Sequence, residues 1–338
     1  MRKKVKWGVI GCAGIAKRAV IPGIQESELN EVAAIASRDA DKARRTAKEL
    51  NIPGAYPSYE ALLEDDSIDA VYIPLPNHLH KEWTIRAAEA GKHVLCEKPL
   101  ALTANEAAEM AEACDKAGVL LSEAFMYRHH PRYRMIREMI ASGRIGAIRG
   151  IHGTFTFNNA ADAANVRYRR DWGGGSLYDV GCYPINAARL LLGTEPEAAT
   201  VQAFFSAEHD GVDMMASGLI EFPGSAALTF DCGMWAAFRN TLQVVGDKGL
   251  IEVPSAFVTG TDDGSNFFVT ADGMREEIQV PDVNQYAAQA DDFARAILGE
   301  QPLPFPPSDA VNNMRVIDAC LQSARSRARI AIVKEREA

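Results

Sequence analysis

Short apolar runs alternate with amphipathic stretches through the first third of the chain. Apolar runs at 5–10, 31–36, 69–73, 93–96 and 119–123 predict strands. Between them, Ala, Leu and Ile recur at helical intervals among charged residues, most clearly at 39–50 and 81–90, which predicts helices. Gly91 and Gly118 stand just before strands, where a glycine commonly ends a helix. The alternation predicts an α/β domain with a parallel sheet and helices on both faces.

The pattern changes after residue 124. A helix at 132–141 is followed by longer alternating segments at 148–157, 200–205, 226–231 and 241–245, which predict a large, open, mostly antiparallel sheet in an α+β domain. Glycines open a helix at 173–193, and helices at 284–298 and 308–329 end the chain. Because 338 residues exceed the usual size of a single core, we expect two domains, 1–123 and 124–338. The final helix is free to pack on the first domain.

Composition and charge exclude several classes of protein. A formal net charge of −9 argues against a nucleic-acid partner. No apolar run approaches the roughly 20 residues of a membrane span, and the basic start is followed by a strand-like segment and a glycine-rich turn rather than by the apolar region and cleavage site of a signal peptide. We therefore expect a cytoplasmic protein without a membrane partner. The six cysteines are scattered without a C-x-x-C pair, so we expect no metal site, with His129-His130 the first place to look for one.

A glycine turn follows the first predicted strand. The segment Gly11-Cys12-Ala13-Gly14-Ile15-Ala16 fits the G-x-G-x-x-G/A dinucleotide fingerprint, with Ala13 at the middle glycine position. A plain strand-to-helix turn is the alternative. The strand before it, the helix after it and a second strand at the right interval favour a Rossmann dinucleotide site.

The second predicted strand ends without a carboxylate at its tip. Ser37 and Arg38 stand there instead, and arginine suits bidentate binding of the 2′-phosphate of NADP(H). Asp39 follows directly and can either cap the next helix or reach a ribose. NADP(H) is therefore the preferred cofactor, and use of NAD(H) stays open.

Two further segments carry groups suited to chemistry. Glu97-Lys98-Pro99 follows a buried strand, so Lys98 is expected at the carboxyl edge of the sheet, where α/β folds bind ligands; a surface lysine is the alternative. After three glycines, Asp179 and Tyr183 stand four residues apart and share one helix face. The alternative, a solvated face, fits poorly with the apolar residues around them.

Together these motifs resemble one enzyme family. Gly11 to Ala16, Pro76-Asn77-His78-Leu79-His80, Glu97-Lys98-Pro99 and Gly173 to Tyr183 resemble the glucose-fructose oxidoreductase/inositol dehydrogenase/rhizopine catabolism (Gfo/Idh/MocA) family. The resemblance spans essentially the whole chain. It is strongest to the branch of NADP-dependent D-xylose dehydrogenases and dimeric dihydrodiol dehydrogenases, and sugar 3-ketoreductases are similar too.

The resemblance implies that Lys98, Tyr183 and Asp179 are catalytic, with Tyr183 where inositol dehydrogenases carry histidine. An alcohol that loses hydride must also lose a proton, and tyrosine, with a pKa of about 10, accepts it only if a cation lowers that pKa. Lys98 is that cation. Asp179 would hold Lys98 or a substrate hydroxyl.

The resemblance also implies a set of cofactor-binding residues: Gly11, Ala13, Gly14, Ile15, Ala16, Ser37, Arg38, Pro74, Leu75, Asn77, His80, Glu97, Lys98 and Arg167. For Asn77 and His80, a helix cap and an exposed histidine are nearly as good an interpretation. Arg128 and Arg167 either face cofactor or substrate or form salt bridges. A cis Lys98-Pro99 bond and a homodimer or homotetramer built on the outer face of the large sheet are also implied.

These interpretations lead to an NADP(H)-dependent oxidoreductase that acts on a ring hydroxyl or ketone of a pyranose sugar or cyclic polyol. A carbohydrate such as D-xylose or D-glucose is the preferred substrate; reduction of a keto-sugar and oxidation of a trans-dihydrodiol are the alternatives. A catalytically silent, nucleotide-sensing regulator is a further alternative, against which the presence of Lys98, Asp179 and Tyr183 argues. Trp172 and Trp235 either stack on a sugar or pack the core.

Overall fold

The computed structural model of the chain describes residues 3–162, 164–259 and 264–333. The chain forms two compact units, Met1–His130 with Val283–Val311, and Pro131–Asp282 with Asn312–Ala338. This division differs from the boundary expected near residue 124, because a late segment of the chain returns to the first unit. The penultimate helix lies in that segment, whereas most of the final helix belongs to the second unit.

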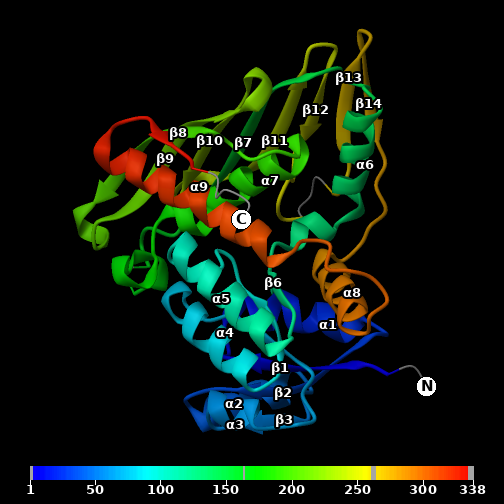
Figure 1. Cartoon of the computed structure of the whole chain (residues 1–338), viewed down its shortest axis with the longest axis vertical. Coiled ribbons are helices and arrows are strands. Elements are labelled where there is room, and N and C mark those ends of the chain that lie inside the picture. Colours follow the sequence, from blue (N-terminus) through cyan, green and yellow to red (C-terminus); the bar gives the residue numbers. More distant parts are fainter. Residues whose placement is uncertain (1–2, 163, 260–263, 334–338) are drawn as a thin grey trace. The chain divides into compact units, whose positions relative to one another are not determined.

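Parallel strands form the sheet of the first unit (Figure 1). Among the described residues it has six, in the order β3-β2-β1-β4-β5-β6. The strands are β1 (Val5–Ile10), β2 (Asn30–Ala36), β3 (Gly54–Tyr56), β4 (Ala70–Ile73), β5 (His93–Cys96) and β6 (Leu121–Glu123). The helices of five or more residues are the π-helical turn η1 (Ala16–Val20), α1 (Ile21–Glu26), α2 (Ala40–Glu49), α3 (Tyr59–Leu63), α4 (His80–Glu89), α5 (Ala104–Ala117) and α8 (Gln285–Ile297). The predicted parallel α/β architecture is confirmed.

Local sequence explains where these elements begin and end. Side chains of Asp39, Ser58 and Thr103 accept hydrogen bonds from backbone N–H groups in the first turns of α2, α3 and α5. Gly118 ends α5 in the left-handed conformation, with a φ of 68°. Strands β4 and β5 are almost wholly buried, as parallel strands covered on both faces should be.

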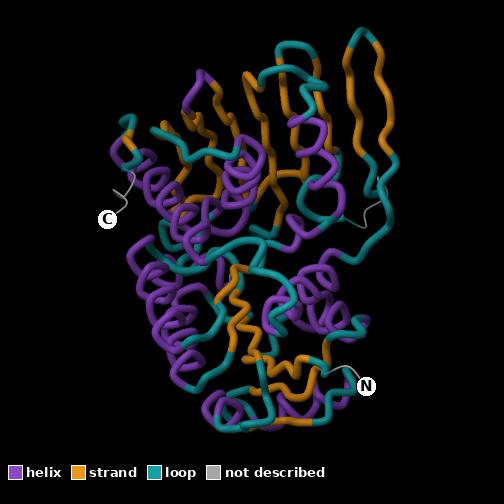
Figure 2. The backbone as a smooth tube through the Cα atoms, turned by 45° about the vertical axis from the view of Figure 1, so that its right-hand side comes forward, coloured by secondary structure: helices purple, strands orange, loops and turns teal. Residues whose placement is uncertain are grey.

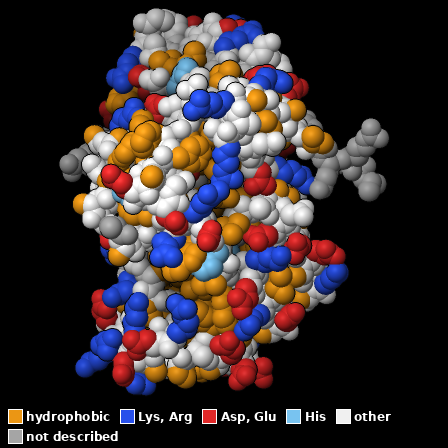
Figure 3. All heavy atoms as spheres, turned by 90° about the vertical axis from the view of Figure 1, so that its left-hand side faces the viewer, with side chains coloured by type: hydrophobic (Ala, Val, Ile, Leu, Met, Phe, Trp, Pro, Cys, Tyr) orange, Lys and Arg blue, Asp and Glu red, His pale blue; other side chains and the backbone are white. Residues whose placement is uncertain are grey.

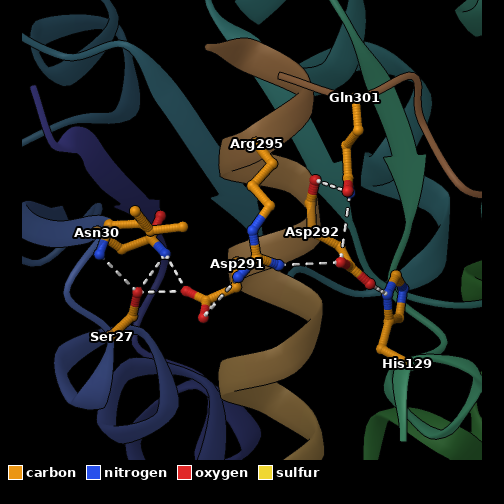
Figure 4. A network of polar contacts seen from close by, with 8 residues as sticks. Ser27, Asn30, His129, Asp291, Asp292, Arg295 and Gln301 are labelled. Atoms are coloured by element: carbon orange, nitrogen blue, oxygen red, sulfur yellow. Dashed lines mark hydrogen bonds and ion pairs between the residues drawn. The ribbon is translucent and has the colours of Figure 1, made fainter. Parts of the chain in front are cut away.

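Helix α8 is part of the core of the first unit although it is distant in sequence. Phe293 on α8 packs against Trp7 on β1, with ring centroids 5.6 Å apart. Polar contacts reinforce this packing (Figure 4): Asp291 accepts hydrogen bonds from Ser27 and from Asn30. Apolar burial and partly buried hydrogen bonds therefore explain why 283–311 belongs to this unit.

The second unit contains a mostly antiparallel sheet, as predicted (Figure 2). Nine strands of the described residues form it, in the order β14-β13-β12-β11-β7-β10-β9-β8-β15. They are β7 (Ile148–Asn158), β8 (Ala198–Ser206), β9 (Val212–Phe222), β10 (Ala226–Gly233), β11 (Trp235–Gly246), β12 (Gly249–Val253), β13 (Phe267–Ala271), β14 (Met274–Ile278) and β15 (Ile330–Ala331). The helices of five or more residues that follow the first unit's sheet strands in the chain and are not yet named are α6 (Pro131–Ala141), the π-helical turn η6 (Leu177–Gly181), α7 (Cys182–Leu192) and α9 (Pro307–Ser326).

Strand register gives this sheet two different faces. Gly153, Phe230 and Leu242 are buried on the face that α7 covers, and Gly153 lets α7 approach closely, because a Cβ there would lie 2.5 Å from Cβ of Pro184. The other face, called here the outer sheet face, carries the row Thr200, Leu219, Thr229, His152 and Gln243, which are paired across β8, β9, β10, β7 and β11. Most of these side chains are exposed, so the two faces differ in their access to solvent.

The distribution of surface charge and the hydropathy of the helices agree with the expectations drawn from composition. On the face drawn in Figure 3, Lys and Arg side chains are interspersed with Asp and Glu side chains. Within the described ranges, no helix combines the length and the apolar character needed to cross a membrane.

Candidate functional site

The glycine turn after β1 leaves its backbone open to close approach. Gly11 has a φ of 109°, which side-chain-bearing residues rarely adopt, and a Cβ on it would lie 3.0 Å from Cδ2 of Leu75. A Cβ on Gly14 would lie 2.7 Å from Nη1 of Arg18, so a guanidinium lies beside the turn. Sequence reasoning missed Arg18, although its position four residues after Gly14 on the following helix was a usable signal.

The end of β2 carries the expected hydroxyl and guanidinium. Ser37 is buried, and its Oγ accepts a hydrogen bond from the N–H of Asp39 at 3.2 Å. Asp39 accepts from the N–H of Lys42 at 3.0 Å, and this hydrogen bond lowers the pKa of Asp39. Of the two roles left open for Asp39, the structure therefore shows the helix cap. Arg38 is exposed.

Tyr59 is a polar group near the turn that sequence reasoning missed. Its hydroxyl lies 3.7 Å from the position that a Cβ on Gly11 would take. Burial raises the pKa of Tyr59, and the cation of Arg38 opposes that rise, which places Arg38 near the same hydroxyl. Tyr59 thus links the glycine turn to Arg38. No local sequence pattern indicated this, because 59 follows a different strand.

Lys98 lies in a firmly anchored loop after β5. The Tyr72 hydroxyl donates to Oε1 of Glu97 at 2.5 Å, and the N–H of Leu100 donates to the buried carboxylate of Glu123 at 2.8 Å. Burial and the charge of Glu97 raise the pKa of Tyr72 well above its usual value, so Tyr72 remains a donor. Lys98 itself is half-buried, and the Lys98-Pro99 peptide is cis, as the resemblance implied.

His80, the first residue of α4, joins this loop to the loop after β4. Its Nε2 lies 2.8 Å from the carbonyl oxygen of Leu75, and its Nδ1 lies 3.0 Å from that of Pro99. The ring is fully buried, which excludes the exposed histidine considered as an alternative, and burial lowers its pKa to about 4. Asn77 begins the short helical turn before α4, and Pro74 is buried at the end of β4.

In the second unit, the glycine run binds the loop that carries Arg167. The N–H of Gly174 donates to the carbonyl of Arg169, and the N–H of Gly175 donates to that of Arg167, both at 3.0 Å. A Cβ on Gly174 would overlap the carbonyl of Arg167. The glycines therefore allow this loop to pack directly on the start of the helix formed by η6 and α7.

Arg167, Asp179 and Tyr183 form an electrostatic cluster there. Nε of Arg167 lies 2.7 Å from Oδ2 of Asp179. The charge of Asp179 raises the pKa of Arg167, and Tyr183 contributes in the same direction, so all three groups are close. Arg167 was expected to face cofactor or substrate or to form a salt bridge, and Asp179 to hold Lys98 or a substrate hydroxyl. The structure shows the salt bridge, and the choice of Asp179 as its partner had no signal in spacing.

Tyr183 lies in an aromatic pocket of the second unit. The residue is 5% exposed, and its ring centroid lies 5.2 Å from that of Phe155 and 5.4 Å from that of Phe257. Phe155 and Phe257 stack on each other at 5.6 Å. This packing restricts the ring of Tyr183 and surrounds it with a medium of low polarity, in which nearby charges act strongly.

Other candidates have structural roles. Arg128 is buried, pairs with Asp309 and lies over the ring of Phe305 at 3.9 Å, so it is a salt-bridge residue. His129 bonds to Asp292 at 2.7 Å. Trp235 stacks on Phe204 at 4.8 Å on the outer sheet face.

Metal and disulfide chemistry find no support in the part of the chain that the structure describes. No group of three or more His, Cys, Asp or Glu side chains there is placed to hold a metal ion. The six cysteines are free, and all except Cys12 are buried.

The first unit fits a dinucleotide. The backbone after Gly11 and the guanidinium of Arg18 suit a pyrophosphate, because a helix start and a cation both attract anions. Ser37 and Arg38 suit an adenosine ribose or its 2′-phosphate. These groups follow β1 and β2, neighbouring parallel strands, at the edge where such folds bind nucleotides.

Comparison with known proteins gives matches over most of the chain. Residues 5–125 match the family described as an oxidoreductase family with an NAD-binding Rossmann fold (GFO_IDH_MocA), and residues 133–252 match the GFO/IDH/MocA C-terminal domain. The D-xylose 1-dehydrogenase (NADP(+)) 2 of Haloferax volcanii is 41% identical over 328 residues, 96% of this chain and 99% of that protein.

Two further relatives act on different substrates. The crystal structure of KijD10, a 3-ketoreductase from Actinomadura kijaniata in complex with NADP and TDP-benzene, superimposes with a TM-score of 0.89 at 33% identity, over 95% of this chain and 98% of that one. The trans-1,2-dihydrobenzene-1,2-diol dehydrogenase of Xenopus laevis is 31% identical over 282 residues, 82% of this chain and 81% of that protein.

Replacing His80 by Gln should reduce the loss of unfolding free energy that accompanies a fall in pH. In the parent protein the pKa of His80 is lowered in the folded state, so the unfolded chain binds the proton more tightly. The free energy of unfolding therefore decreases as pH falls from about 6.5 towards 4. The lowered pKa corresponds to a loss on the order of 3 kcal/mol across that window. Urea unfolding at several pH values measures it. The exposed His152→Gln serves as control, and an unchanged acid limb in His80→Gln would refute the assignment.

Proposed function

Because the chain belongs to the Gfo/Idh/MocA family of oxidoreductases, we propose that it transfers hydride between NADP(H) and a ring hydroxyl or ketone of a pyranose sugar or cyclic polyol. The preferred substrate is an aldose such as D-xylose or D-glucose, and the 41% identity to a D-xylose dehydrogenase supports this choice. The observation that carries the proposal is the buried Tyr183 beside the Arg167–Asp179 ion pair.

The proposed chemistry separates the hydride from the proton. Bound nicotinamide would supply the hydride acceptor for oxidation of the alcohol carbon and the hydride donor for reduction of the carbonyl carbon. Tyr183 takes the hydroxyl proton during oxidation and returns it to the carbonyl oxygen during reduction. Tyrosine needs a nearby cation to lower its pKa for this purpose, and the family motif implies that Lys98 is that cation. Asp179 balances the charge of Arg167 and positions it beside Tyr183.

The proposed cofactor contacts follow the strands of the first unit. The turn Gly11 to Ala16 and Arg18 would hold the pyrophosphate, and Ser37 and Arg38 the adenosine end. Asn77, Glu97 and Lys98 would bind near the nicotinamide ribose. Because His80 already faces the carbonyls of Leu75 and Pro99, its proposed part is to hold these loops in place.

Two alternative substrates have support from relatives. A keto-sugar would be reduced by the same groups, as the likeness to the 3-ketoreductase suggests, and a trans-dihydrodiol would be oxidised by them. A silent regulator is disfavoured, because Lys98, Asp179 and Tyr183 are all present.

Turnover of NADP+ and NAD+ with a panel of aldoses, inositols and trans-dihydrodiols, and of NADPH with keto-sugars, tests the proposal.

With the best substrate, Tyr183→Phe should slow single-turnover hydride transfer by about 10²- to 10⁴-fold, because the proton has no acceptor. Affinity for NADP(H) should stay within about twofold, since the binding groups remain. Tyr133→Phe, which removes another buried hydroxyl of the second unit, is the control. Near-normal rates in Tyr183→Phe would sink the assignment.

Cofactor choice can be tested at Arg38. Replacing Arg38 by Ala should lower kcat/KM for NADP(H) about 10- to 100-fold, the loss expected for a charged hydrogen bond, and leave that for NAD(H) within about threefold. Steady-state kinetics with both cofactors give the comparison, with the exposed Arg86→Ala of the same unit as control. Equal losses with the two cofactors would contradict the role.

We further propose that the chain forms a homodimer or homotetramer through the outer sheet face. Phe204, Leu219 and Trp235 are 54%, 39% and 36% exposed there, and Phe204 stacks on Trp235, so large apolar side chains interrupt an otherwise polar face. Phe204→Glu and Leu219→Glu should each shift the assembly towards monomer in sedimentation velocity, since a charge would be buried. Met274→Glu, at an exposed apolar residue of β14, is the control. An assembly unchanged by both substitutions would overturn the proposal.

A further inference from the structure

A buried carboxylate lies at the start of the helix that carries Asp179 and Tyr183. Asp213, the second residue of β9, is 2% exposed. Its Oδ2 accepts hydrogen bonds from the Ser176 hydroxyl and from the N–H of Leu177, both at 2.7 Å. Leu177 begins η6, so Asp213 satisfies donors in the first turn, as an N-cap side chain would, but from a strand distant in sequence.

The other carboxylate oxygen faces Gly175. A Cβ on Gly175 would overlap Oδ1 of Asp213, and Gly175 has a φ of 120°. The same glycine donates its N–H to the carbonyl of Arg167 and accepts at its carbonyl from the N–H of Asp179, both at 3.0 Å. Asp213 therefore lies directly against Gly175, the residue whose two backbone hydrogen bonds place Arg167 and Asp179.

The position is a costly one for an acidic group. Burial raises the pKa of Asp213 to about 6, while the hydrogen bonds from Ser176 and Leu177 oppose that rise. The titratable group facing it from β10 is the thiol of Cys232, which lies 3.5 Å from the Ser176 hydroxyl. Neither group supplies a positive charge. The N–H dipole of Leu177 and the O–H dipole of Ser176 therefore stabilise the negative charge of Asp213, and the carboxylate in turn holds these two groups in place.

The helix start itself needs such support. Residues 177–181 form a π-helical turn, a wider and rarer arrangement than the α-helix that follows from Cys182. Return of this turn to α-helical geometry would rotate Asp179 relative to Tyr183.

We propose that Asp213 is a positioning residue that holds the π-helical turn and, through it, the orientation of Asp179 and Tyr183. This inference rests on the proposed function, in which those two residues serve the reaction. Asp213 acts through Ser176, Leu177 and Gly175 and is not proposed to contact substrate or cofactor.

The test compares Asp213→Asn and Asp213→Ala with Asp231→Asn, which changes a partly exposed carboxylate on β10. With the substrate found by the panel, Asp213→Ala should lower kcat about 100-fold, as expected for a misplaced group, and Asp213→Asn about 10-fold, with KM for NADP(H) unchanged in both. Asp231→Asn should match the parent. An amide restores one acceptor, so this partial rescue distinguishes positioning from general destabilisation.

A second measurement is independent of turnover. In protein labelled with ¹³Cζ-tyrosine, the resonance missing from Tyr183→Phe identifies Tyr183. Asp213→Asn should shift or broaden that resonance while Asp231→Asn leaves it unchanged. An unmoved resonance together with unchanged kcat would overturn the inference, even if Tyr183→Phe is inactive. An active Tyr183→Phe would instead overturn the proposed function, and a shifted resonance would still support the positioning of Tyr183 by Asp213.

Discussion

Parallel pairing of β1 with β2 and β4, and of β4 with β5, is the constraint on which the first unit depends. Parallel strands all end at one edge of a sheet, so segments far apart in sequence must emerge together. The glycine turn, Ser37 and the Lys98 loop are neighbours for this reason. Tyr72, Glu123 and His80 then remove the remaining freedom of the Lys98 loop by hydrogen bonds to Glu97, Leu100 and Pro99. The order of the strands thus brings the segments of the site together, and buried hydrogen bonds then fix their positions.

Local signals in the sequence predicted much of the fold. Alternation of apolar runs and helices predicted the parallel sheet, and Gly11, Gly118 and the run from Gly173 marked real turns and helix ends. Strands β9, β12, β13 and β14 were not among the predicted segments, and β3 and β15, of three and two residues, are too short to carry a periodicity. The return of α8 to the first unit was missed too, since its partners Trp7 and Asn30 lie more than 250 residues earlier.

The candidate site shows the same limit more sharply. Lys98, Asp179 and Tyr183 were found by motif, and their catalytic roles stay predictions. Tyr59 and Asp213 were not found, because each is defined by what it faces rather than by its neighbours in the chain, and Arg18 was missed although its spacing from Gly14 was a usable signal. The pair of Arg167 with Asp179 joins two residues assigned to different tasks. Periodicity reveals elements, whereas a buried hydrogen bond between elements is visible only once the fold brings them together.

The place of α8 also bears on how the chain acquires its structure during synthesis. Phe293, Ala290 and Ala294 complete a core that begins with Val5 and Trp7. The ribosome therefore releases the whole second sheet up to β14 before the first unit has all of its apolar partners. Until then Trp7 and its neighbours lack the surface that finally covers them, and a chain cut after β6 would expose that apolar patch to water.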